Sequence, residues 1–203
     1  MEIGKGEDVV VNNKINTFHG PVVDAIRNRR VSRNFTHEDI PNEYILTLLE
    51  SGRFAPTGGG RRVIEYIVIK NEENIRKIRA VSPGILNLPK TILLMIINHN
   101  KEKKIEFDDT EQFSSYVDIG TAMENILLTA YEINLGACPI MSFHKGAIRV
   151  LLDLPNHVEP VLMIILGFQL DQKKNKTGKK LQLSKLKEIT SWEKYGQFEQ
   201  ENI

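Results

Sequence analysis

The feature that most constrains the fold is the segment from Ser115 to Asn134, in which apolar residues cover most of the circumference of a helix. A helix on the surface of a monomer needs only about a third of its circumference apolar. We therefore expect this helix to lie between its own sheet and a second apolar surface, most economically the same helix of a second subunit. A helix buried wholly within one subunit is the alternative. The polar residues fall on one narrow stripe: Asp118, Thr121, Asn125, Thr129 and Glu132.

The rest of the chain alternates helical and extended segments, without repeats or linkers. Pro21 marks a helix start, followed by an apolar face that includes Val22 and Ile26. Further helices are predicted over 42–54, 72–81 and 148–152, and β-branched residues predict strands over 65–70, 91–98 and 158–168, the last interrupted by Pro160. This order is mixed α+β and has no nucleotide-binding glycine motif. We expect an N-terminal arm, 1–20, and a single domain, 21–203.

Composition excludes several classes of protein. With 203 residues, 41% hydrophobic and 26% charged, the chain is typical of one soluble domain. A net charge of +1 gives no field to attract nucleic acid or an anionic membrane. There is no secretory signal or membrane-spanning run, and a single cysteine, Cys138, rules out an internal disulfide, so we expect a cytoplasmic protein. No ligand spacing suggests a metal. His144 is interpreted as a surface or helix-start residue rather than a proton donor.

A basic cluster follows the first helix, with the sequence Arg29-Arg30-Val31-Ser32-Arg33-Asn34-Phe35. Guanidinium groups match phosphate in geometry and remain charged at any relevant pH. An aromatic residue at the end of the cluster can enter a core and anchor it. The pattern is consistent with an anchored anion site, and the alternative is a solvated surface.

The basic cluster becomes specific for a family only together with three later segments, which follow it in a fixed order. These are 55–60 (Ala-Pro-Thr-Gly-Gly-Gly), 118–128 and 160–168. With this ordered set the chain resembles the nitroreductase family of FMN-dependent oxidoreductases, from about Val22 to about Gly196. The resemblance implies a three-layer α/β/α fold with a central, mostly antiparallel sheet. It also implies a homodimer with the long central helix at its interface.

The resemblance further implies which residues bind FMN. The arginines would reach the phosphate, ribityl chain and pyrimidine edge. After the long helix, the amides of Met141 and Ser142 would lie near flavin N5, with Pro139 and Ile140 packed on the ring. The alternative is that this stretch is simply the connection from the helix into a strand. One C-terminal lysine, Lys179 or Lys180, would hold the phosphate, although such a run is usually a solvated loop.

The chain departs from the family pattern at several positions. Val31 stands where the family has Ser, and Gly60 and Arg62 stand where it has Asn and Gln. The three glycines 58–60 would let backbone approach a flat ring, or would suit a mobile loop. Arg62 would contact the flavin or substrate, or lie exposed. The expected cofactor contacts are Arg29, Arg30, Val31, Arg33, Thr57, Gly58, Gly60, Arg62, Pro139, Ile140, Met141, Ser142, Lys179 and Lys180.

The activity implied is that of an FMN-dependent oxidoreductase. Electrons would pass from NADH or NADPH through FMN to a small acceptor such as a nitroaromatic or quinone, in a ping-pong cycle without a catalytic side chain or metal. The segment 101–113 lies where the family shapes its substrate entrance. The alternatives are a flavin-binding protein with weak or no turnover, motivated by Val31 and Gly60, and a cofactor-free structural dimer.

Overall fold

The computed structural model describes residues 20–101, 110–170 and 191. Nearly all of the expected N-terminal arm lies outside these residues, as do Lys179 and Lys180. None of the helices between 20 and 101 or between 110 and 170 is long and apolar enough to cross a membrane.

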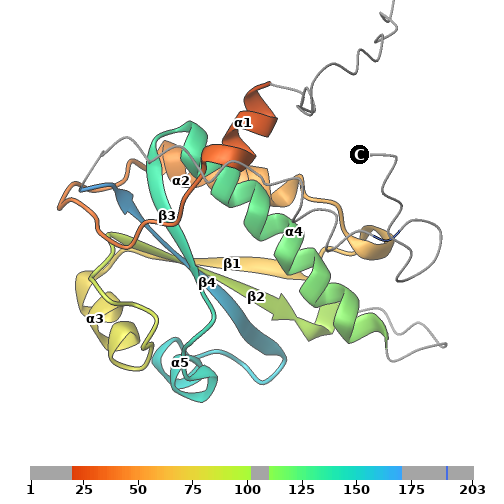
Figure 1. Cartoon of the computed structure of the whole chain (residues 1–203). Coiled ribbons are helices and arrows are strands. Elements are labelled where there is room, and N and C mark those ends of the chain that lie inside the picture. Colours follow the sequence, from red (N-terminus) through yellow and green to blue (C-terminus); the bar gives the residue numbers. More distant parts are fainter. Residues whose placement is uncertain (1–19, 102–109, 171–190, 192–203) are drawn as a thin grey trace, which may run out of the picture.

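A four-stranded antiparallel sheet forms the middle of the molecule (Figure 1). Its order is β1-β2-β4-β3, and its two central strands lie close to their predicted bounds. These strands are apolar along most of their length because both of their faces are covered by helices. The strands are β1 Ile64–Ile69, β2 Thr91–Asn98, β3 Leu135–Ile140 and β4 Val158–Phe168.

Helices cover both faces of the sheet, which gives the expected three layers (Figure 1). One face of β2, including Leu93 and Met95, packs with α2 and α4, while the alternate residues Ile92 and Leu94 pack with α3 and α5 on the other face. The first helix, α1, lies against α4. The helices are α1 Pro21–Asn28, α2 Asn42–Arg53, α3 Glu72–Ala80, α4 Thr110–Glu132 and α5 Lys145–Leu151.

Pro160 bends β4 without ending it. Met95 pairs with Leu162, whereas the next residue, Ile96, pairs with Pro160, so Val161 is the extra residue of a bulge. A proline is tolerated in a strand at such a bulge because its missing amide hydrogen is not needed there. The predicted interruption is therefore a local register shift.

Two helix boundaries differ from those expected. The long helix α4 begins at Thr110 rather than Ser115 and ends at Glu132, before Asn134, which has the left-handed φ of 58° common after helix ends. The short helix α5 begins at Lys145 rather than Ile148. Its start is fixed by His144, whose Nδ1 accepts a hydrogen bond from the Ala147 amide at 3.0 Å. His144 is therefore a helix cap, one of the roles expected for it.

Candidate functional site

The arginine segment is joined to one end of the sheet by backbone hydrogen bonds. The Ser32 amide donates to the Ala137 carbonyl of β3 at 3.0 Å, and the Thr36 amide donates to the Phe168 carbonyl of β4 at 2.8 Å. The Leu170 amide returns a bond to the Asn34 carbonyl at 3.2 Å. The segment is thus held through its main chain, which leaves its side chains available for other contacts.

Phe35 anchors the segment by packing against two strand glycines. A Cβ at Gly167 would lie 2.6 Å from the Phe35 Cβ, and one at Gly136 would lie 3.0 Å from the Ser32 Cβ. Any larger residue would push the segment away from the sheet. The aromatic residue is half-buried and packs against the core, in the space that the two glycines leave.

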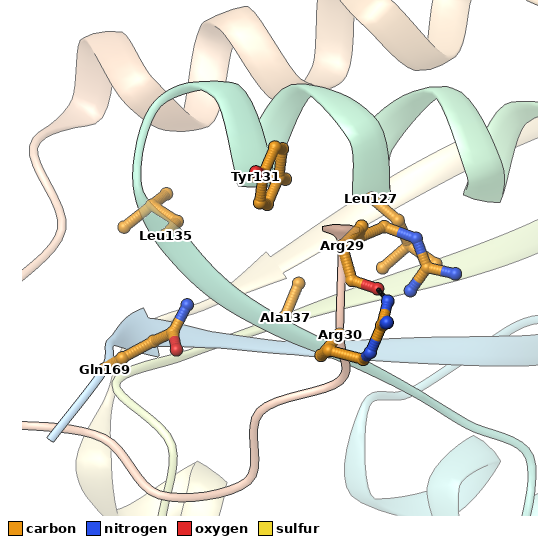
Figure 2. Close-up of a pocket in the computed structure, with 7 residues that line it drawn as sticks. All are labelled: Arg29, Arg30, Leu127, Tyr131, Leu135, Ala137 and Gln169. Carbon is orange, nitrogen blue, oxygen red and sulfur yellow. Dashed lines mark hydrogen bonds between the residues drawn. The ribbon is translucent and has the colours of Figure 1, made fainter. Parts of the chain in front are cut away.

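Arg29 and Arg30 line a pocket between α4 and β3 (Figure 2). The Arg29 Nε lies 3.3 Å from a Glu124 carboxylate oxygen on α4. Arg30 folds back, and its Nη1 donates to the Arg27 and Arg29 carbonyls at 2.7 Å each. The pocket is small, with a cavity volume of about 10 Å³. Its other lining residues, which sequence reasoning missed, are Leu127, Tyr131, Leu135, Ala137 and Gln169.

The remaining residues of this group follow the same two segments. Val31 is 46% exposed, and Arg33 is also exposed. Beyond β3, Met141 and Ser142 are exposed, whereas the side chain of Ile140 is buried in the core on the α5 side. Any contact of Ile140 with a ring outside the sheet would therefore involve its backbone.

Cys138 lies in β3, where its side chain is buried. Burial raises the pKa of its thiol, and the charge of Arg33 lowers that pKa by less. A thiol in this environment stays protonated, in agreement with the structural role expected for it.

The glycine segment forms a 3₁₀ turn, Gly58–Gly60, rather than an extended loop. Gly59 and Gly60 have φ angles of 62° and 68°, which favour glycine. The Gly58 amide donates to the Asp118 carboxylate at 2.9 Å, and the Gly58 carbonyl accepts from Arg61 Nε at 3.1 Å.

The polar stripe of α4 faces the chain around this turn. Thr121 donates to the Pro56 carbonyl at 3.2 Å, and Asn125 donates to the Ser51 carbonyl at 3.1 Å. Asp118, on the same stripe, is only 4% exposed. Sequence reasoning identified the stripe without finding its partners, although polar residues in regular spacing on an apolar helix were the available signal.

The predicted site residues therefore form two groups along α4. Arg29 lies beside Glu124, whereas Gly58 lies beside Asp118, about 9 Å earlier along the helix axis. Arg62 belongs to neither contact set, because its Nη1 donates to the Arg53 carbonyl at the end of α2. The structure brings the arginines together with β3 and holds the glycine turn separately.

Apolar residues remain exposed on α4 and α1 in the single chain. Phe113 is 70% exposed and Val117 49% exposed on α4, and the space beside Gly120 is open. On α1, Val22 is 66% exposed and Ile26 54% exposed. The helix α4 thus has a buried side within its own core and an apolar side without a partner in the described part of the chain.

Comparison with known proteins identifies the family. A model of the Nitroreductase family matches residues 26–87 and 82–168, which include the arginine segment, the glycine turn, α4 and β4. The chain belongs to the nitroreductase family. The match covers most of the sheet and both groups of predicted site residues.

Individual members of the nitroreductase family agree with this assignment. The chain is 29% identical over 153 residues to a Methanothermobacter thermautotrophicus protein provisionally named NADH dehydrogenase/NAD(P)H nitroreductase, covering 72% of this chain and 76% of the other. It is 24% identical over 176 residues to an FMN reductase [NAD(P)H] of Bacillus subtilis, covering 76% and 68%. A nitroreductase family protein of Clostridium difficile superposes with a TM-score of 0.70 at 25% identity, covering 85% and 98%.

Proposed function

We propose that this nitroreductase-family chain is an FMN-dependent NAD(P)H oxidoreductase whose acceptor is a small molecule such as a nitroaromatic or a quinone. The observation that carries the proposal is the pair of arginines in the pocket at the edge of β3, within a chain of this family. Relatives named FMN reductase and NAD(P)H nitroreductase support the choice of cofactor and donor.

The described residues fit the phosphate of FMN in charge. Arg29 approaches Glu124 only through Nε, and in the described part of the chain no hydrogen bond occupies its two Nη groups. Those groups are free to bind a phosphate in the two-point manner that guanidinium favours. Leu127 and Leu135 are buried and close the floor of the pocket.

When bound, FMN would supply the chemistry, which is transfer of two electrons from NAD(P)H to the acceptor. The chain supplies binding, orientation and charge. Positive charge from Arg29 and Arg30 favours an anionic ligand in the pocket. Met141 and Ser142 are exposed after β3, and their amides would bond the ring edge. No proton-transferring side chain is required.

We further propose that the protein is a homodimer packed through the exposed side of α4. Phe113 and Val117 supply apolar area there, and Gly120 allows close approach of a second helix. A single cysteine fits the reducing cytoplasm in which we place the protein.

The first test is an anaerobic visible spectrum of the purified protein, with FMN added if needed, before and after NADH or NADPH. Flavin bands that bleach and then return when a quinone is added support the proposal. Bands that persist with both donors would instead support a flavin-binding protein without this turnover. If no flavin remains bound after reconstitution and desalting, the cofactor assignment is wrong.

A further inference from the structure

Gly58 is held at both its N–H and its C=O by charged side chains from different parts of the chain. The Asp118 carboxylate of α4 accepts its N–H, and the Arg61 guanidinium donates to its C=O. Arg61 also donates through Nη2 to the Ser114 hydroxyl, one turn before Asp118 on the same helix. Hydrogen bonds to ionised groups are about twice as strong as neutral ones, so this peptide is fixed more firmly than an ordinary loop peptide.

The arrangement is not optimal for stability alone. The second carboxylate oxygen of Asp118 and the Nη1 of Arg61 are buried without a hydrogen-bond partner in the described part of the chain. Buried polar atoms without partners destabilise a fold and are uncommon, so each requires an explanation. An apolar residue at position 118 would remove the buried charge, but it would also remove the acceptor of the Gly58 amide and so release the turn.

The turn itself needs such support. Three consecutive glycines lose more conformational freedom on ordering than other residues, and two of these have left-handed φ angles. The amides of Gly58, Gly60 and Arg61 are bound by Asp118, Thr57 and Gly58 respectively. Of the four amides from Gly58 to Arg61, only that of Gly59 has no hydrogen-bond partner in the described ranges. Gly59 is also exposed. The clamp therefore leaves one amide of an ordered turn available to a ligand.

We propose that Asp118 and Arg61 are positioning residues that hold the Gly58–Gly60 turn in the shape in which its free Gly59 amide meets bound flavin. This inference rests on the proposed function. It assigns the support of the turn to Arg61 rather than to Arg62, whose contact is with the end of α2. Neither Asp118 nor Arg61 touches the cofactor itself in this role.

The test compares Asp118→Ala with Asp118→Asn, which keeps an oxygen able to accept from the Gly58 amide. The matched control is Asn125→Ala, which removes the neighbouring contact of the same polar stripe, to Ser51. Two quantities are measured on the full chain: hydrogen exchange at the amides of 58–61 without FMN, and the Kd for FMN by fluorescence. Arg61→Lys provides a second variant should Asp118→Ala fail to fold, because it keeps the charge and loses the two-point contact.

Asp118→Ala is expected to speed exchange at Gly58 and to weaken FMN binding about tenfold, the size of one charge-assisted hydrogen bond. Asp118→Asn should bring both the exchange rate and the Kd for FMN most of the way back to wild type. Arg61→Lys should also weaken FMN binding. Asn125→Ala should lower the melting temperature without changing the Kd. If the folded Asp118→Ala or Arg61→Lys variant binds FMN as tightly as wild type, this inference is wrong and the proposed function is unaffected. Wild-type protein that binds no FMN overturns the proposed function as well, so the two failures are distinguishable.

Discussion

The two halves of the candidate site are anchored in opposite ways. The arginine segment is held by main-chain hydrogen bonds to β3 and β4, so its charged side chains are not needed for its own placement. The glycine turn has no pairing with a strand and is placed by the side chains of Asp118 and Arg61. Loss of packing should therefore displace the first half, whereas loss of a single side-chain hydrogen bond should displace the second.

The largest effect should come from Phe35→Ala, which removes the anchor of the arginine segment. Truncating a packed aromatic residue costs about 3 kcal/mol of unfolding free energy, and somewhat less where solvent reaches it. Urea unfolding measures this loss, and FMN affinity should fall with it. The control is Phe54→Ala, at a side chain that is 78% exposed, where the change should stay within about 0.5 kcal/mol. Equal losses in the two variants would contradict the anchoring role.

Arg29→Ala should leave the segment in place and weaken FMN binding by about 1.5–3 kcal/mol, the range for hydrogen bonds to charged groups. Titration of the desalted protein with FMN measures the effect. Glu124→Gln serves as the control because it removes the ion pair with Arg29 and leaves the guanidinium intact. If both variants lose the same affinity, Arg29 acts by joining its segment to α4 rather than by binding the phosphate.

These contrasts also explain what the sequence could predict. The sequence predicted strands β2 and β4 and helix α4 because these elements are covered on more than one side. Their apolar residues therefore follow a pattern that can be recognised locally. The partners of Asp118 were not predicted, because the bond to Gly58 joins residues 60 positions apart and depends on how α2 packs on α4. Tyr131 and Gln169 were missed for the same reason: they enter the pocket from different elements and carry no local motif.

A smaller effect is expected from Gly59→Ala, which strains the glycine turn without removing either charged contact. A left-handed φ costs alanine about 1 kcal/mol more than glycine, and no atom lies within 4 Å of the added Cβ. Thermal unfolding should detect this loss. The control, Gly20→Ala, has equally open space and an extended φ of 175°, and should be close to neutral. If the two variants are equally stable, the turn does not hold this conformation in solution.

The smallest effect concerns Glu159 of β4, which supports the start of α4 near the glycine turn. Its carboxylate accepts hydrogen bonds from Lys145 at 2.7 Å and from Tyr116 of α4 at 2.9 Å, and His99 lies 3.3 Å away. Partial burial raises the pKa of Glu159, but these partners together lower it by more, so the net shift is downward. The stabilisation is therefore present above the ordinary glutamate pKa of 4.5 and is lost as the pH falls through the lower value in the folded protein.

Glu159→Gln should accordingly reduce stability at neutral pH by less than about 1 kcal/mol, because solvent reaches this group. The difference in melting temperature between wild type and variant should shrink as the pH is lowered below 4.5. Because Tyr116 precedes Asp118 on α4, the variant should also speed exchange at the glycine turn while leaving the Ser32 amide protected by β3. Equal changes at both places would mean that the two halves of the site share one anchor after all.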